Sequence, residues 1–174
     1  LRAYFGDAVA DIDCTFAAGG NASTLRDAIA RIRREAEDAV RAGRSELFLS
    51  DQNIGENRVG VAMVLAAAAV HTHLVRKGLR SYASINVRSA EVLDTHAFAV
   101  LVGVGATTVH AYLAEAAIAD RQTRGLFGEL SLDGRVAASP GVLLAALHAG
   151  SAEKGLICPA LQGPEAAWAG HVEV

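Results

Sequence analysis

Short apolar runs alternate along this chain with longer segments in which apolar residues recur at helical spacing. The runs are residues 46–50 (ELFLS), 81–89 (SYASINVRS) and 107–112 (TTVHAY), and the helices expected after them are residues 58–77, 94–102 and 113–124. Parallel strands need a crossover connection, which a helix of this length provides. We therefore expect an α/β fold of three layers, with a mainly parallel sheet built of βα units.

Two segments precede and one follows these three units. Residues 21–43 are expected to form a further helix, whose N-cap candidates are Asn21, Ser23 and Thr24. Asp27 is a weak capping-box partner of Thr24, and Gly43 is the natural end of the helix. We expect residues 1–20 to be an extended lead-in. After residue 128 we expect one to three more strands that extend the sheet, a helix over 139–148, and Trp168 anchoring the last helix to the core.

The length and composition of the chain fit one globular domain, residues 1–174. Hydrophobic residues make up 52% of it and charged residues 20%, which is far from the composition of disordered chains. The net charge of −3 and the pI near 6.1 provide no basic face, so we expect no nucleic acid partner and no binding to anionic membranes.

Two further absences bound the cellular setting. The longest apolar stretch, residues 59–70, is rich in alanine and too short to cross a bilayer. Cys14 and Cys158 are far apart, have no CxxC neighbour, and imply neither a disulfide framework nor a zinc site. With no secretory signal at residues 1–20, these features indicate the cytoplasm.

Polar residues follow the expected strands at their carboxyl ends, where open parallel sheets bind ligands. They are Ser50, Asp51 and Asn53 after the first strand, Arg88 after the second, and His110 and Tyr112 after the third. Asp51, Arg88 and His110 could form an anion-binding or acid–base cluster. The alternative, which we favour, is that they form salt bridges with one another at a loop edge.

Other polar or glycine motifs have simpler structural explanations. His71 and His73 lie two residues apart on a helix and point in nearly opposite directions, so we expect one against the sheet and the other near Arg76 rather than a shared metal ion. For His96 we expect a capping or intrahelical hydrogen bond. Residues 103–105 (GVG) follow a helix and precede a strand, the reverse of a dinucleotide-binding loop, which favours a helix end.

Three longer strings carry a family resemblance: AVHTHLVRKGLR (69–80), SINVRSAEVLDTH (84–96) and VGVGATTVHAYLAEAAIADRQTRGLFG (102–128). Residues 11–127 resemble part of the central domain of the glutamate synthase large subunit. That family makes two glutamates from glutamine and 2-oxoglutarate. Its amidotransferase domain uses a cysteine nucleophile to release ammonia, and its FMN and iron–sulfur domain reduces the iminoglutarate.

The resemblance implies a scaffold that lies between those two catalytic domains and helps to enclose the ammonia path. Neither the nucleophile nor the cysteine cluster of the family maps onto this chain. We therefore expect no catalytic, cofactor-binding or metal-binding residues here, although the family uses FMN and an iron–sulfur cluster.

Residues 128–174 depart from this pattern. The string GELSLDGRVAASPGVLLAALHAG is similar to the N-terminal region of competence-type magnesium-chelatase-like ATPases. This resemblance implies a chimera, natural or engineered, joined near residues 127–132. No GxxxxGK[ST] motif occurs in the chain, so we expect no ATPase activity from this part.

Three interpretations follow. The chain is a folded structural domain or chimera without catalysis of its own, or a component of glutamate synthase that is active only with the missing domains. In the third, it is an assembly module that forms a homodimer through an exposed sheet edge or a former interdomain face. Bound flavin would favour the second, and a concentration-dependent mass would favour the third.

Overall fold

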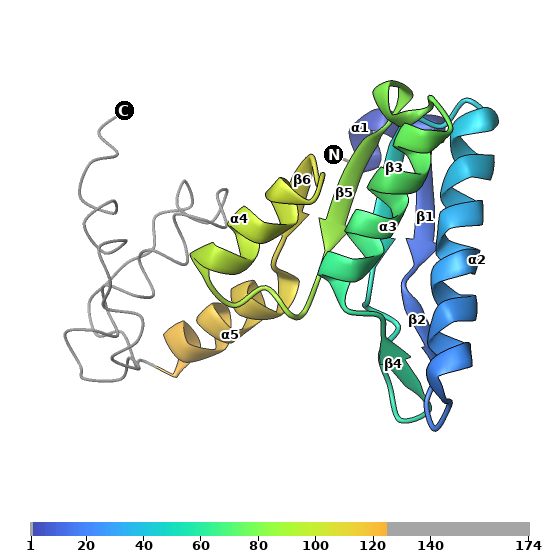
Figure 1. Ribbon diagram of the computed structural model, residues 1–174. Helices are drawn as coiled ribbons and strands as arrows, with labels where there is room; N and C mark the ends of the chain where they lie inside the picture. The colour runs from blue at the N-terminus through green and yellow to red at the C-terminus, as the bar shows by residue number, and fades with distance from the viewer. Residues whose placement is uncertain (1, 125–174) are drawn as a thin grey trace.

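A computed structural model describes residues 2–124 of the chain (Figure 1). In chain order the elements are α1 (Arg2–Phe5), η1 (Gly6–Ala8), β1 (Val9–Asp13), β2 (Thr15–Ala17), α2 (Ala22–Arg41), β3 (Glu46–Ser50), β4 (Arg58–Gly60), α3 (Met63–Arg76), η2 (Arg80–Tyr82), β5 (Ser84–Arg88), α4 (Thr95–Gly103), β6 (Thr108–His110) and α5 (Tyr112–Thr123). The predicted α/β class is confirmed.

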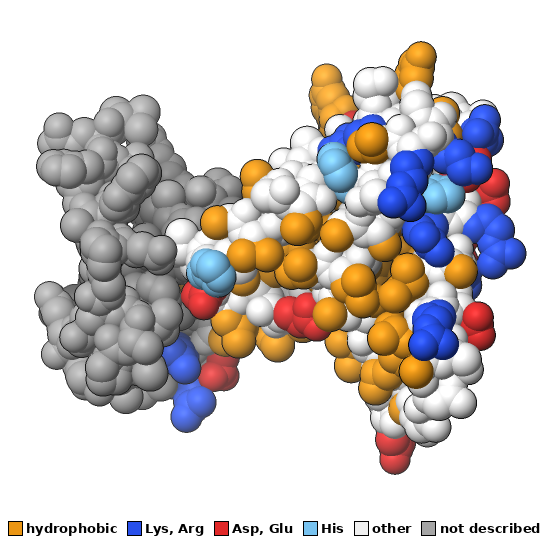
Figure 2. Space-filling model, viewed as in Figure 1, with side chains coloured by type: hydrophobic (Ala, Val, Ile, Leu, Met, Phe, Trp, Pro, Cys, Tyr) orange, Lys and Arg blue, Asp and Glu red, His pale blue; other side chains and the backbone are white. Residues whose placement is uncertain are grey.

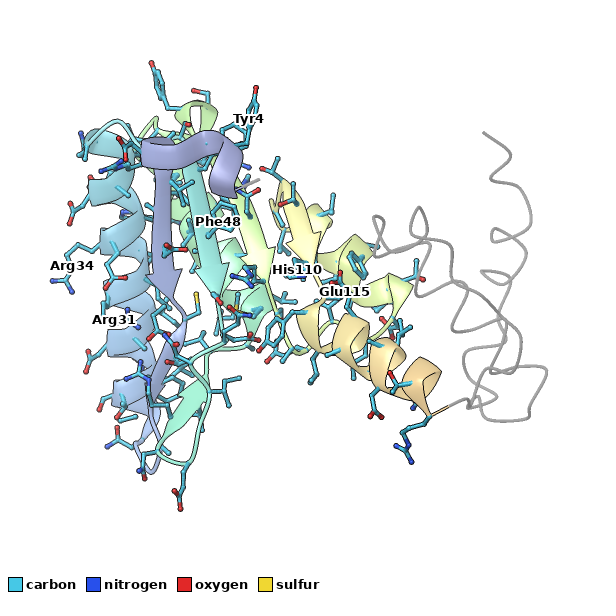
Figure 3. All side chains as sticks on the ribbon, turned by 180° about the vertical axis from the view of Figure 1, so that it is seen from behind. Tyr4, Arg31, Arg34, Phe48, His110 and Glu115 are labelled. Atoms are coloured by element: carbon cyan, nitrogen blue, oxygen red, sulfur yellow. The ribbon has the colours of Figure 1, made fainter. Side chains whose placement is uncertain are left out.

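Four strands form one parallel sheet in the order β1-β3-β5-β6. The order runs in one direction, and right-handed crossovers of that kind place their helices on one face of the sheet. Helices α2, α3 and α4 lie on that face, whereas α1 crosses the opposite face near the amino ends of the strands (Figures 1 and 3). Helices therefore flank the mainly parallel sheet, as predicted.

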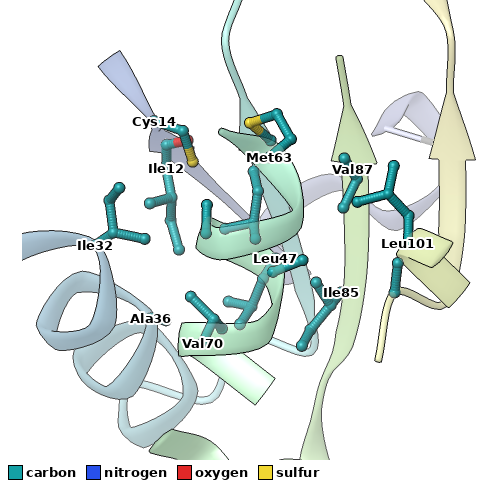
Figure 4. Packing of buried hydrophobic residues seen from close by; sticks show 14 of the residues in the cluster. Ile12, Cys14, Ile32, Ala36, Leu47, Met63, Val70, Ile85, Val87 and Leu101 are labelled. Atoms are coloured by element: carbon teal, nitrogen blue, oxygen red, sulfur yellow. The ribbon is translucent and has the colours of Figure 1, made fainter. Parts of the chain in front are cut away.

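The core lies between the sheet and α2, α3 and α4. Leu47, Leu49, Ile85 and Val87 alternate along β3 and β5 and meet Ile32 of α2, Val70 of α3 and Leu101 of α4 (Figure 4). All of these side chains are almost fully buried. Each such burial contributes about 1.5–3 kcal/mol before the entropy cost of ordering, which makes this cluster the main source of stability.

The opposite face of the sheet carries polar side chains. Asn86 of β5 donates a 2.9 Å hydrogen bond to the Glu46 carboxylate of β3 and accepts a 2.6 Å bond from the Thr108 hydroxyl of β6. Phe48 lies on the same face because it is in register with Asn86. This chain of side-chain hydrogen bonds links three adjacent strands, so the buried polar groups are satisfied.

The predicted extended lead-in is correct only in part, because residues 2–5 are helical and the extended residues 9–13 belong to the main sheet as its edge strand β1. Ile12 points into the core, whereas Asp11 is exposed and Asp13 is half-buried. The acidic residues at alternate positions reflect an edge strand with a polar outer face.

The helix predicted over 58–77 is partly wrong, because it begins at Met63. Residues 58–60 form β4, which pairs antiparallel with β2 in a two-stranded arm that extends past the carboxyl ends of the main sheet (Figure 1). The α3 start is fixed by a distant residue: the Glu91 carboxylate accepts a 2.9 Å hydrogen bond from the Met63 amide. Local sequence contains no signal for such a contact.

Helix α2 begins and ends close to the predicted positions, but its capping differs. Asn21 is the N-cap, and it forms a capping box with Thr24. The prediction of Asp27 as the capping-box partner is therefore wrong. Gly43 has a φ of +86° directly after the helix, as expected of a glycine that ends it.

The expectations for residues 128–174 lie outside the described residues. These are the extra strands, the helix over 139–148 and the roles of Cys158 and Trp168. The single domain over 1–174 also stays a prediction. Within residues 2–124, none of the helices combines the length and apolarity that crossing a membrane requires.

Candidate functional site

The carboxyl ends of the main strands converge on the buried carboxylate of Asp51, directly after β3. Only 1% of Asp51 is exposed. It accepts hydrogen bonds from the Ser89 hydroxyl (3.1 Å), the Ala90 amide (2.9 Å) and the Tyr112 phenol (2.9 Å). These donors come from the loop directly after β5 and from the start of α5. A buried carboxylate is expensive unless it is paired or hydrogen-bonded, and here three donors satisfy it.

Tyr112 is the second member of this site, and its phenol is less acidic than usual because it is partly buried and bonded to Asp51. Burial and the hydrogen bond to Asp51 raise its pKa to about 12. The phenol therefore stays protonated at neutral pH and acts as a donor to the carboxylate. A proton held in this way serves to fix the structure and is poorly placed for transfer.

The predicted cluster of Asp51, Arg88 and His110 forms only in part. The backbone joins the three residues, because the Asp51 amide donates to the Arg88 carbonyl and the Ser89 amide donates to the His110 carbonyl. Their side chains do not pair. His110 lies 3.0 Å from Glu115 in the first turn of α5 (Figure 3). The favoured alternative, mutual salt bridges among the three, is therefore wrong for these described residues.

Arg88 stays half-buried beside this site. Its guanidinium lowers the pKa of Tyr112, against the larger effects of burial and Asp51. Among the described residues, it makes no side-chain hydrogen bond or ion pair within the usual distances. Among the predicted pocket residues, Arg88 is thus the one whose side chain forms no hydrogen bond or ion pair with another described residue.

Asn53 lies elsewhere, next to Asp13 at the base of the β2–β4 arm. Hydrogen bonds from Thr15 and Asn53, together with the Arg58 charge, outweigh burial and lower the pKa of Asp13. Arg58 reaches the Asp13 carboxylate at 2.8 Å, and Arg31 of α2 donates to the backbone carbonyls of Asp13 (2.8 Å) and Thr15 (3.0 Å). Arg31 thus joins α2 to the start of the arm, and Arg58 joins β4 to the same two residues, Asp13 and Thr15.

Sequence reasoning missed this arginine cluster. An open depression of about 250 Å³ adjoins it, lined by Thr15, Phe16, Thr24, Asp27, Ala28, Arg31 and Arg58. Arg31 appears in the sequence as one of several charged residues on a solvated helix face, and Arg58 as the start of a helix. Their contacts join residues 16 and 43 positions apart, so the spacing gave no signal.

Cys14 lies between β1 and β2 and is fully buried. Burial raises the pKa of its thiol to about 12. Because the thiolate is the reactive form, this cysteine is a poor nucleophile and a poor metal ligand.

The two histidines of α3 have separate partners. His71 accepts a 3.1 Å hydrogen bond from Arg80 of η2, and His73 lies 2.6 Å from Glu37 of α2. These partners, on η2 and α2, were not predicted, and the expected placements against the sheet and near Arg76 stay predictions. Asp94 caps α4 through the Ala97 amide, and His96 is exposed. Within residues 2–124, no three His, Cys, Asp or Glu side chains lie close enough together to hold a metal ion.

Comparison with known proteins decides the family. The family model described as "Glutamate synthase central domain" matches residues 2–154. The chain belongs to the glutamate synthase central domain family. The glutamate synthase [NADPH] large chain of Azospirillum brasilense is 56% identical over 133 residues, and the ferredoxin-dependent glutamate synthase of Spinacia oleracea is 41% identical over 97 residues.

These alignments cover 76% and 55% of this chain but only 9% and 6% of the two relatives. The chain thus spans less than a tenth of the length of the glutamate synthases it matches. The family match also runs without a break through the predicted join near residues 127–132. The magnesium-chelatase-like segment and the chimera find no support in these comparisons.

The described part of this central domain does not fit an iron–sulfur cluster. Such clusters are held by several cysteine thiolates, whereas Cys14 is a single, buried cysteine with a raised pKa. The described residues therefore offer no ligand set for the cluster, and we derive no chemical step through it. That the chain holds no cofactor at all stays a prediction.

Proposed function

We propose that this chain is a non-catalytic structural segment of a glutamate synthase large chain. In this role it supports the parts of the long polypeptide that form glutamate from glutamine and 2-oxoglutarate. Family membership supports the component interpretation, and the small share of the relatives that the chain covers is in keeping with a segment that acts only together with the rest.

The observation that carries this proposal is the state of Asp51. A parallel sheet offers its ligand site outside the carboxyl ends of its strands. Here the one buried carboxylate among the described residues at that edge is bonded to Ser89, Ala90 and Tyr112. A carboxylate that is saturated by internal donors joins β3, β5 and α5 and has little capacity left for a substrate or a proton.

The cellular setting belongs to the same proposal. A cytoplasmic location rests on the low cysteine content of the sequence, which holds only Cys14 and Cys158 without a CxxC pair, and the absence of nucleic acid and membrane partners rests on the net charge of −3.

The test uses the large chain that carries this segment, with two kinds of substitution. Arg88→Ala with His110→Ala removes the two polar side chains that a ligand could still reach. Asp51→Ala instead leaves Ser89, Ala90 and Tyr112 without their acceptor and destabilises the joint. Glutamate formation from glutamine and 2-oxoglutarate is measured for each, alongside the melting temperature.

A structural role predicts that Arg88→Ala with His110→Ala keeps kcat and kcat/KM within about twofold of the unaltered chain. It also predicts that Asp51→Ala lowers the melting temperature and that activity is lost in parallel with folding. A loss of roughly tenfold or more in kcat for the double variant, at an unchanged melting temperature, would show a catalytic or binding role and contradict the proposal.

A further inference from the structure

A nearly uncharged outer surface covers α4 and the first turns of α3. Residues 59–75 contain no Asp, Glu, Lys or Arg, and residues 95–119 contain only Glu115, although 20% of the whole chain is charged. Two carboxylates, Glu91 and Asp94, lie between these ranges and accept hydrogen bonds from the Met63 and Ala97 amides at the starts of α3 and α4. Figure 2 shows hydrophobic side chains gathered over α4 and the start of α3, with an acidic side chain among them, whereas the basic side chains lie along α2, at the far end of α3 and near the end of α5. Charge depletion of this kind distinguishes the centre of an interface from ordinary surface.

Large side chains in this region are exposed. They are Val64 (38%) and Leu65 (43%) of α3, Leu93 (60%) before α4, Val102 (56%) of α4 and Leu113 (48%) of α5. We call these five residues the apolar surface. Single exposed apolar residues are common on soluble proteins, but a group on adjacent elements, whose nearby carboxylates Glu91 and Asp94 already cap α3 and α4, indicates a binding surface.

Helix α4 supplies an independent reason. Its sequence, THAFAVLVG, is apolar on all sides, yet Leu101 is its only fully buried residue. A surface helix normally has one polar face, and a helix that is hydrophobic all round is normally enclosed by protein. One side of α4 covers β6, and its other side has no cover within the described residues.

We propose that the apolar surface is the contact through which this segment docks onto another part of the same glutamate synthase polypeptide. The inference rests on the proposed function, because it requires the longer chain. The chain spans only 9% of the Azospirillum brasilense relative, so such a polypeptide has ample surface to cover it.

The chemistry of the surface defines its partner. Its nearby carboxylates, Glu91 and Asp94, already accept hydrogen bonds from the amides of α3 and α4 and leave little charge for selecting a partner by ion pairing. The counter-surface should therefore be mainly apolar and matched in shape. An acidic protein, a nucleic acid or a phospholipid headgroup would find no complementary charge here.

Hydroxyl-radical footprinting with mass spectrometry tests the proposal on unaltered protein, which avoids the risk that a variant fails to fold. The 174-residue chain and the large chain that contains it are labelled under the same conditions. Tyr82 of η2, which is 68% exposed and lies outside the apolar surface, is the matched control. We expect labelling of Leu65, Leu93 and Leu113 to fall several-fold in the large chain, with Tyr82 unchanged.

Two results would overturn the proposal. Equal labelling of the three leucines in both proteins means that the rest of the large chain does not cover them. If the three leucines are already protected from labelling in the 174-residue chain, something other than the rest of the large chain covers the apolar surface. A concentration-dependent mass would then identify a second copy, and a constant monomer mass would identify residues 125–174. Each of these results is independent of the activity assay on Arg88 and His110, so failure of one proposal can be told from failure of the other.

Discussion

Tyr112 donates a 2.9 Å hydrogen bond from its phenol to the buried carboxylate of Asp51, which lies 61 residues earlier in the chain. The bond joins the loop after β3 to the first residue of α5. Of the three contacts that hold Asp51, it alone comes from α5, because Ser89 and Ala90 lie in the loop after β5. It therefore holds the start of α5 against the sheet.

Removing this donor should destabilise the fold. A hydrogen bond to a charged group contributes about 1.5–3 kcal/mol, so Tyr112→Phe should lower the free energy of unfolding by an amount in the lower part of that range, because Tyr112 is only half-buried. Urea denaturation measures the change. The control Tyr82→Phe alters an exposed tyrosine and should have almost no effect. Equal values for the two variants would mean that the bond does not stabilise the fold.

The same pairing predicts a loss of stability in alkali. The pKa of Tyr112 is raised from 10 to about 12 in the folded chain, so the unfolded chain releases this proton first as the pH rises. The stabilisation is complete below pH 10 and is lost as the pH rises from about 10 to about 12. Melting temperatures across this range should fall more steeply for the unaltered chain than for Tyr112→Phe. Parallel curves would contradict the shift.

Gly105 should tolerate no side chain. Its φ is +111°, and a Cβ at this position would overlap the imidazole ring of His71. Gly105→Ala should therefore cost more than the roughly 1–2 kcal/mol of a left-handed backbone alone. Gly103→Ala is the matched control, since nothing lies within 4 Å of its added Cβ. Thermal denaturation of both variants decides the point, and similar melting temperatures would be inconsistent with this packing.

Glu37 should make the fold sensitive to acid. Hydrogen bonds from Arg41 and His73 lower its pKa from 4.5 to about 2. A lowered pKa means that the stabilisation is present above pH 4.5 and is lost as the pH falls from about 4.5 to about 2. Glu37→Gln should be less stable at neutral pH and should lose less stability over that acid range. An unchanged acid profile would show that the interaction is absent in solution.

Much of the sheet could be predicted because its signals are local. The apolar run of β3 and the helical spacing of α2 and α5 depend on nearby residues alone, and burial confirms these patterns. Strand β1 was missed because an edge strand exposes every second residue, and its acidic side chains resemble those of a loop. Strand β4 was missed because its pairing with β2 joins residues far apart in sequence.

The site around Asp51 could be predicted only in part, because some of its contacts follow from strand order and others depend on loop conformation. The rule that polar residues at the carboxyl ends of parallel strands meet at one edge brought Asp51 and Tyr112 together correctly. It could not identify Ser89 and the Ala90 amide as the other donors, because their roles depend on how the loop after β5 turns. The contacts of Arg31 and Arg58 with Asp13 and Thr15 could not be predicted either, because arginines in a segment read as a helix are usually solvated.

The central claim is that the carboxyl edge of this sheet is a structural joint and binds no substrate. Its most direct test is the melting temperature of the 174-residue chain, measured with increasing glutamine, 2-oxoglutarate, glutamate or FMN, because a ligand that binds the folded state raises it. A structural joint predicts no change with any of the four. A concentration-dependent rise that Arg88→Ala abolishes would contradict the claim and identify a ligand site at this edge.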